Sequence, residues 1–116
     1  MNPAPPKWYY VYLLRSKEDS SIYPAPHKKG GIYPRPSKMG GIYIGCTSNL
    51  SKRLQEHKEG KNYSTKKLLP VELIYFEAYK SKEDAFEREK RLKYYSSALR
   101  NLKLRLQNTF GKGGAG

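Results

Sequence analysis

Three short runs rich in aromatic and β-branched residues constrain the fold of this 116-residue chain more than any other feature. They are Trp8–Leu14 (WYYVYLL), Gly41–Cys46 (GIYIGC) and Val71–Ala78 (VELIYFEA). Prolines precede the first and third runs, and proline is compatible with the start of a strand but interrupts a helix, so we expect strands. Three short strands form one small sheet, and the length of the chain is that of one domain.

Helix signals follow the second and third runs. Asn49 is a good N-cap and Gly60 a good C-terminal stop, Ser81 with Asp84 three residues later resembles a capping box, and Ser97 is a third candidate cap. The predicted helices cover residues 50–59, 82–94 and 98–107. This order of strands and helices predicts an α+β domain.

A ten-residue repeat separates the first two strand-like runs. IYPAPHKKGG is followed by IYPRPSKMGG and then by IYIG, with the repeats starting at residues 22, 32 and 42. Its prolines and paired glycines exclude a helix or a central strand, so we expect an extended loop over 20–41. Two interpretations stay open: a local duplication of the segment that leads into the second strand, or a DNA contact. The basic side chains for the second are Lys28, Lys29, Arg35 and Lys38.

Positive charge dominates the composition. Lys+Arg number 23 against 10 Asp+Glu, a net charge of +13, which attracts polyanions. Nucleic acid or an anionic membrane surface is the natural partner, although a ribosome-associated or merely soluble basic domain has the same charge. The aromatic content of 13% distinguishes the chain from a disordered basic tail. Because no amphipathic basic helix carries large aromatic anchors, we expect no membrane partner.

The cysteine and histidine counts exclude two kinds of site. One cysteine, Cys46, forms no internal disulfide, and with two histidines it provides no structural zinc site. We therefore expect a cytoplasmic protein. The Pro-rich segment 1–7 has no apolar core of a signal peptide, and no apolar run approaches the roughly 20 residues that span a bilayer. We expect the domain itself over 8–107 and a flexible Gly-rich tail over 108–116.

Charged side chains interrupt the apolar stripes of the first two predicted helices. In the first, Arg53 and His57 share a face with two leucines. A buried guanidinium costs several kcal/mol unless it is paired or hydrated, so this face borders a wet cleft. In the second helix, Glu89 lies among apolar positions. The alternatives are that Arg53 extends to solvent, that His57 is an ordinary helix-end histidine, and that Glu89 pairs with Lys93 or Arg88. Together, however, a carboxylate and an arginine suit a phosphodiester site, where one holds a hydrated divalent ion and the other a phosphate.

The run IYIGCTSNLSKRLQEH resembles one half of the GIY-YIG nuclease motif, in which a strand ends in tyrosine and glycine and a helical arginine follows ten residues later. Tyr43, Gly45 and Arg53 have that spacing, and His57 stands where family members carry a histidine or tyrosine. Upstream, YYVYLLRS resembles the other half, with Tyr12 as its tyrosine and Tyr10 in place of the glycine. The resemblance is closest to the small stand-alone bacterial members, although the loop between the two half-motifs is longer than usual.

Downstream, PVELIYFEAYKSKEDAFEREKRLK resembles the family's third strand and the helix with its metal-binding glutamate, which falls on Glu89. The resemblance implies a three-stranded antiparallel sheet flanked by helices, and phosphodiester hydrolysis with Mg²⁺ or Mn²⁺ held by Glu89. Arg53 would hold the phosphate. Which of Tyr43, Tyr12 and His57 is the general base stays open. A free tyrosine has a pKa near 10, so forming its phenolate at pH 7 costs about 4 kcal/mol. Asn101 matches an asparagine of some members, and chance explains that match equally well.

Further residues are expected around the cleft as phosphate contacts. They are Ser64, Thr65, Lys66, Lys67, Lys90, Arg91 and Lys93. Such contacts give salt-dependent affinity with little sequence specificity. The sequence thus predicts a metal-dependent DNA endonuclease that cuts duplex, single-stranded or branched DNA, with repair or recombination structures as expected substrates. The alternative is a non-catalytic nucleic-acid-binding protein with the same fold.

Overall fold

The computed structural model describes residues 6–17 and 41–110. It contains the strands β1 (Tyr9–Ser16), β2 (Ile42–Thr47) and β3 (Val71–Tyr79) and the helices α1 (Leu50–Lys58), α2 (Tyr63–Lys66), α3 (Lys82–Tyr94), α4 (Ser96–Arg105) and α5 (Gln107–Phe110). The strands form one antiparallel sheet in the order β2-β1-β3, which confirms the predicted α+β fold. The repeat lies outside the described residues, so both interpretations of its role stay predictions.

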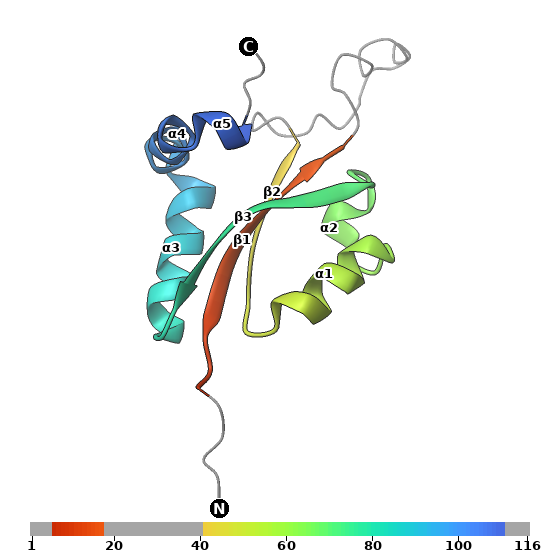
Figure 1. The fold of residues 1–116 in the computed structure, drawn as a ribbon, viewed down its shortest axis with the longest axis horizontal. Helices are drawn as coiled ribbons and strands as arrows, with labels where there is room; N and C mark the ends of the chain where they lie inside the picture. The colour runs from red at the N-terminus through yellow and green to blue at the C-terminus, as the bar shows by residue number, and fades with distance from the viewer. Residues whose placement is uncertain (1–5, 18–40, 111–116) are drawn as a thin grey trace, which may run out of the picture.

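The sheet separates two layers of helices. In Figure 1, α3, α4 and α5 lie on one side of the strands, and α1 and α2 lie on the other. The central strand β1 is therefore covered on both faces, and its residues Val11, Tyr12, Leu13 and Leu14 are all buried. Side chains alternate along a strand, so Val11 and Leu13 face one layer while Tyr12 and Leu14 face the other. This alternation directs Tyr12 toward α1.

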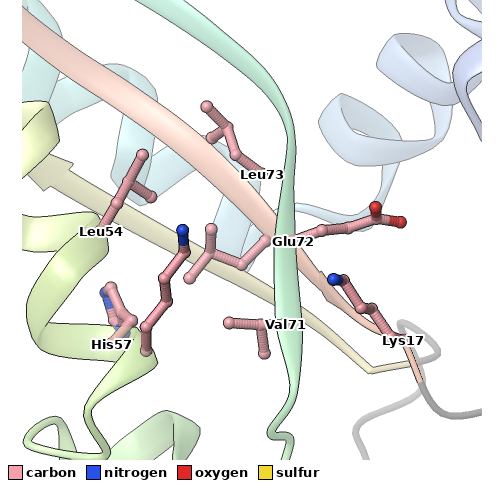
Figure 2. Close-up of a pocket in the computed structure, with 8 residues that line it drawn as sticks. Lys17, Leu54, His57, Val71, Glu72 and Leu73 are labelled. Carbon is pink, nitrogen blue, oxygen red and sulfur yellow. The ribbon is translucent and has the colours of Figure 1, made fainter.

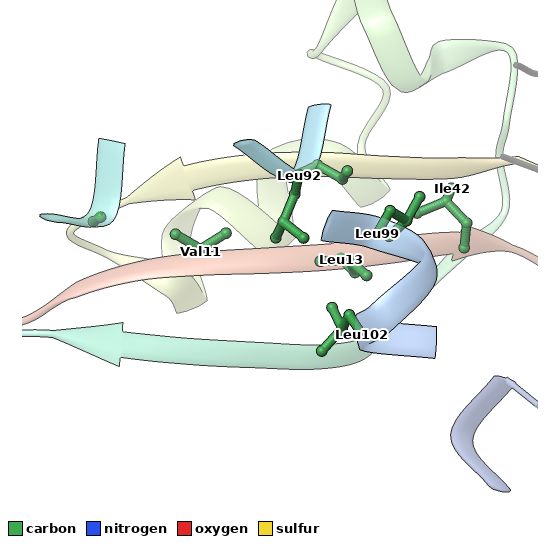
Figure 3. Packing of buried hydrophobic residues seen from close by; sticks show 8 residues of the cluster. Val11, Leu13, Ile42, Leu92, Leu99 and Leu102 are labelled. Carbon is green, nitrogen blue, oxygen red and sulfur yellow. The ribbon is translucent and has the colours of Figure 1, made fainter. Parts of the chain in front are cut away.

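Each face has its own hydrophobic core. Under α3 and α4, leucines of both helices pack against Val11, Leu13 and Ile42 (Figure 3). On the other face, Tyr12, Leu14 and Val71 pack against the leucines of α1 and of the segment after α2. The two helices that carry the predicted site residues, α1 and α3, are thus held against opposite faces of one small sheet.

Two of the three predicted helices have the predicted caps. The Asn49 side chain accepts a hydrogen bond from the Lys52 backbone N–H at 3.1 Å, and Gly60 has a φ of +75°, which suits its stop position after α1. The Ser81 hydroxyl accepts from the Asp84 N–H at 3.1 Å and caps α3.

The predicted Ser97 cap is wrong. Helix α4 begins at Ser96, and its N-cap, Tyr95, makes no side-chain cap bond. The chain turns again at Leu106, and residues 107–110 form α5, in which Phe110 packs against the α3-side core. Residues 108–110, expected in the tail, therefore form part of a helix. Among the described residues, no helix is long and apolar enough to cross a membrane.

Candidate active site

A buried chain of hydrogen bonds joins β1, α1 and α2. The Tyr12 hydroxyl lies 2.8 Å from His57 Nε2, and His57 Nδ1 lies 2.8 Å from Thr65 Oγ1. All three side chains are fully buried. Burial and the nearby Arg53 charge lower the pKa of His57, so the ring is neutral at pH 7 and has one donor and one acceptor nitrogen.

The direction of these bonds follows from the network. Thr65 Oγ1 donates to the Asn62 carbonyl at 3.4 Å, so it accepts from His57 Nδ1–H. Nε2 then accepts from Tyr12. Burial, followed by the neighbouring Tyr43, raises the pKa of Tyr12, which keeps its hydroxyl protonated as this bond requires. Tyr12 and His57 therefore hold each other in one orientation.

Tyr43 lies on the same face of the sheet, beside this pair. Its ring centroid is 5.0 Å from that of His57 and 6.1 Å from that of Tyr12. Unlike the other two rings, Tyr43 is only partly buried. Gly45 makes this close packing possible, because a Cβ at position 45 would lie 2.5 Å from Tyr12 Cζ and Oη. The glycine of β2 thus has a structural reason: the ring of Tyr12 occupies the space where a side chain at position 45 would lie.

Arg53 lies next to the three rings. Its guanidinium is close enough to the Tyr12 hydroxyl to lower the pKa of that group, against the larger effect of burial. The Arg53 side chain is 36% exposed, and its Nε pairs with Glu56 Oε1 at 3.3 Å. Leu50 and Leu54 of the same stripe pack into the core, as expected. Arg53 is therefore a solvent-accessible cation at the border of a buried cluster.

Glu89 belongs to the other layer. It lies on α3 between the buried Ala85 and Leu92, and its side chain is 21% exposed. Its Oε2 pairs with Lys93 Nζ at 3.1 Å, which is the ion pair considered as an alternative from the sequence. Arg88, the other possible partner, pairs with Glu77 instead.

The thiol of Cys46 on β2 is affected by charges from both helical layers. Burial and then the Glu89 carboxylate raise the pKa of the Cys46 thiol, while Arg53 and Lys93 lower it. Charges from α1 and α3 thus both act on one side chain of β2, which is an edge strand of the sheet. Arg53 and Glu89 therefore lie in opposite helical layers, each near Cys46 of this edge strand.

The expected phosphate contacts differ in accessibility. Thr65 is fully buried and bonded to His57, so its hydroxyl is not available to a phosphate at the surface. No signal in the sequence indicates that this polar side chain is buried, because its burial depends on the packing of α2 against α1. The remaining side chains are exposed, and two of them already have acidic neighbours: Lys93 pairs with Glu89, and Arg91 with Glu87 at 3.2 Å. The exposed set is Ser64, Lys66, Lys67, Lys90, Arg91 and Lys93, and Asn101 is also exposed on α4.

A second polar network was not predicted. Glu77 of β3 accepts hydrogen bonds from Arg88 Nε and Nη2 of α3, each at 2.9 Å, and from the Tyr75 and Tyr79 hydroxyls. Burial alone would raise the pKa of Glu77, but these donors outweigh it and the net pKa is lowered. Burial and the bond to Glu77 also raise the pKa of Tyr75 to about 12. This network holds α3 against β3, one residue away from Glu89.

A pocket of about 170 Å³ lies on the α1 side of the sheet (Figure 2). His57 and Leu54 of α1 face Val71 and Leu73 of β3 across it, with Lys17 and Glu72 at its rim. Neither Tyr43 nor Arg53 lines it. Of the candidate catalytic side chains, the pocket therefore borders His57 alone.

The described residues contain no group of three or more His, Cys, Asp or Glu side chains that could hold a metal ion. Glu89 is a single, partly exposed carboxylate. Mg²⁺ commonly binds through one or two carboxylates and keeps several waters, so a single carboxylate is a suitable donor for it. The residues present fit a largely hydrated divalent ion and do not fit a site built from protein ligands alone.

The structure is an α+β domain whose small antiparallel sheet carries a tyrosine pair, with an arginine on one flanking helix and a glutamate on another. A model of the GIY-YIG catalytic domain matches residues 29–103. The chain is 35% identical over 99 residues to UPF0213 protein CPE1444 of Clostridium perfringens, covering 84% of this chain and 80% of that protein. It is 32% identical over 89 residues to UPF0213 protein SH2523 of Staphylococcus haemolyticus, covering 76% and 83%. No solved structure matches.

The chain belongs to the GIY-YIG family, and its relatives are small stand-alone bacterial proteins. Its catalytic domain indicates a nuclease-type hydrolase. Neither relative's name states an activity. The matched residues do not include β1, so the assignment of Tyr12 rests on its contacts with His57 and Tyr43.

Proposed function

We propose that this protein is a divalent-metal-dependent DNA endonuclease that hydrolyses phosphodiester bonds in repair or recombination structures. The observation that carries the proposal is that edge strand β2, which bears Tyr43, is flanked by Arg53 of α1 and Glu89 of α3, whose charges both act on its Cys46 thiol. The family membership supports hydrolysis of nucleic acid, and the net charge of +13 supports a polyanionic substrate.

Arg53 is the phosphate-binding residue of the proposed site. A guanidinium binds two phosphate oxygens with paired hydrogen bonds and stabilises the negative charge that grows on them during attack by water. Its side chain is 36% exposed, which allows contact with the substrate, and its present partner Glu56 is also on the surface. Substrate binding would exchange that surface ion pair, worth little in water, for a phosphate contact.

Tyr43 is the proposed general base. Tyr12 is buried, and its raised pKa opposes loss of its proton. His57 is buried too, and both of its ring nitrogens are engaged, by Tyr12 and by Thr65. Tyr43 is the partly exposed member of the three, which favours it as the residue that would take a proton from the attacking water. Tyr12 and His57 then act as positioning residues that hold the Tyr43 ring in place.

Glu89 is the proposed metal ligand, with Mg²⁺ or Mn²⁺ as the ion. The bound ion would supply positive charge beside the leaving oxygen. An ion held by Glu89 would compete with the Lys93 ammonium for the carboxylate, and Lys93 would then be available to a neighbouring phosphate. The proposed function therefore uses Lys93 as a phosphate contact after its ion pair with Glu89 is exchanged for the metal.

Nicking of DNA in the presence and absence of Mg²⁺ or Mn²⁺ tests this function. We expect Glu89→Ala and Arg53→Ala each to lower metal-dependent cleavage at least about a hundredfold, the scale on which single transition-state contacts act, while binding at low salt is retained. Glu87→Ala is the matched control, because Glu87 lies on the same helix with its side chain 54% exposed and pairs with Arg91. If the wild type shows no metal-dependent cleavage of duplex, single-stranded or branched substrates, the proposed enzymatic function is wrong.

A second candidate is a non-catalytic nucleic-acid-binding protein. The observation that favours it is that Arg53 and Glu89 already have ion-pair partners, Glu56 and Lys93. For this candidate, the substrate panel gives binding without cleavage, and the Glu89 and Glu87 variants behave alike.

A further inference from the structure

Three aromatic side chains continue from the candidate site along one face of the sheet. Tyr12 pairs with Phe76 across β1 and β3, and the next pair on the same face is Tyr10 with Ala78. The Tyr10 and Phe76 rings meet edge to face at 5.8 Å and 66°. Trp8 immediately precedes β1, and Lys80, which follows β3, has its Nζ 5.5 Å from the Trp8 ring centroid. We call Trp8, Tyr10 and Phe76 the aromatic face.

The aromatic face is not part of the core on which it borders. Tyr12 is fully buried, whereas Phe76 is 47% and Trp8 is 40% exposed. Neither Trp8 nor Phe76 packs in the α1-side core with Tyr12 and Leu14. Exposed apolar side chains on a protein surface are usually scattered singly. Several large apolar rings that lie together on an exposed strand surface therefore indicate a binding site.

The charge of the molecule selects the kind of ligand. Lys80 lies over the Trp8 ring, and the chain as a whole carries a net charge of +13. A ligand that suits both features has flat aromatic groups on a polyanionic backbone. Unpaired nucleobases on a phosphate chain have this chemistry, and exposed aromatic rings beside cations bind them by stacking. In a duplex the bases stack on one another, so their faces are not available.

We propose that the aromatic face binds the unpaired bases of a single-stranded segment next to the cleavage site. Phe76 is the cross-strand neighbour of Tyr12 on β3, and Tyr12 pairs in turn with Gly45 of β2, so a strand that stacks on Phe76 and Tyr10 lies one strand away from the β2 edge of the candidate site. The substrate class that follows is DNA with an unpaired segment, such as a single strand, a flap or a fork. The position of the cut rests on the proposed function, and the binding of bases does not.

Binding of the full chain to an oligothymidylate without divalent metal tests the aromatic face. We expect Phe76→Ala to weaken binding about tenfold, within the range found for single base-stacking residues. Phe76→Tyr keeps a ring and should keep the affinity. Phe86→Ala is the matched control: Phe86 is 49% exposed and has Lys82 Nζ at 5.6 Å, but it lies on α3, outside the aromatic face. It should stay within about twofold of the wild type.

A second measurement separates stacking from charge. Trp8 is the chain's single tryptophan, so its fluorescence reports on this face alone. We expect quenching by the oligothymidylate and much less by an abasic oligonucleotide of equal length, which has the phosphates without the bases. Equal quenching by both, or unchanged affinity of Phe76→Ala, overturns the proposal.

The same samples distinguish the two proposals after metal is added. Metal-dependent cleavage without base-dependent binding supports the nuclease and overturns the aromatic face as a base-binding site. Base-dependent binding without cleavage of any substrate supports the aromatic face as a base-binding site and overturns the nuclease.

Discussion

At the scale of single residues, His57 joins the stability of the fold to the arrangement of the candidate site. Its ring is buried and neutral, with one nitrogen bonded to Tyr12 and the other to Thr65. Protonation would add a buried charge beside Arg53, which is why its pKa is lowered. The same ring packs against Tyr43 at 5.0 Å. A change at His57 therefore alters both the free energy of unfolding and the position of the proposed general base.

The pH dependence of the free energy of unfolding tests this assignment. The folded-state pKa of His57 lies below the ordinary 6.5, so as pH falls below 6.5 the unfolded chain takes up a proton that the folded chain does not. The contribution of His57 to the free energy of unfolding should be fully present above pH 6.5. It should decrease toward pH 5, by up to about 1.4 kcal/mol per pH unit. Urea unfolding of the wild type and His57→Gln at several pH values measures this slope.

The slope, and not the absolute stability, is the informative quantity, because His57→Gln also removes buried hydrogen bonds. His27, the chain's other histidine, is present in both proteins and serves as an internal control. Carboxylates titrate mostly below this window. A wild-type slope that persists unchanged in the variant would assign the titration to another group.

At the scale of elements, the Glu77–Arg88 pair fixes α3 to the sheet. Two guanidinium nitrogens contact the Glu77 carboxylate, and the side chains of Arg88 and Glu77 are only 25% and 14% exposed. Glu89 follows Arg88 directly in α3, so the rotation that brings Arg88 to β3 also sets the direction of Glu89. This pair connects β3 to the proposed metal ligand.

Arg88→Ala should lower the free energy of unfolding by about 2 kcal/mol, because it leaves a mostly buried carboxylate with tyrosine hydroxyls as its remaining donors. Arg91→Ala is the control on the same helix. Its ion pair with Glu87 has side chains 58% and 54% exposed, so removing that pair should cost less than about 0.5 kcal/mol. Urea denaturation of both variants measures the difference. Equal decreases in stability would show that the network does not stabilise the attachment of α3.

The elements set by local signals were predictable from the sequence. Helices α1 and α3 have side-chain caps at Asn49 and Ser81, and their apolar stripes correctly gave the face toward the sheet. Helices α2 and α5 have four residues each, too few for a periodic pattern, and were not predicted. Ser97 has the chemistry of a cap, but the chain is already helical at Ser96.

Tertiary contacts of the site were predictable only in part. Arg53 and Glu89 became candidates because a charge in an apolar stripe is visible in the sequence, and their roles stay predictions. Arg88 contacts Glu77 across eleven residues and two elements, which no local pattern reveals. Thr65 was expected at a phosphate, and its burial follows from the contact of α2 with His57. The register that aligns Phe76 with Tyr12 also depends on how β1 and β3 pair.

At the scale of the whole molecule, positive charge is spread over both helical layers. Lys66 and Lys67 lie at the end of α2, next to Thr65 and therefore near the candidate site. Arg100 and Arg105 are equally exposed on α4, across the sheet. If the net charge of +13 acted only as a diffuse attraction, removing two charges from either layer would weaken DNA binding by the same amount.

Direct phosphate contacts act differently, because each one releases a bound counterion from the DNA. On duplex DNA, the slope of log affinity against log salt concentration then changes by about 0.9 for every phosphate that a substitution leaves without its cation. We expect the double variant Lys66→Ala/Lys67→Ala to have a slope shallower by nearly 2, and Arg100→Ala/Arg105→Ala to keep the wild-type slope with slightly weaker binding. Fluorescence anisotropy at several salt concentrations, without divalent metal, measures both. Equal changes in slope for the two variants would show that DNA does not distinguish the end of α2 from α4, and would overturn the assignment of Lys66 and Lys67 as phosphate contacts.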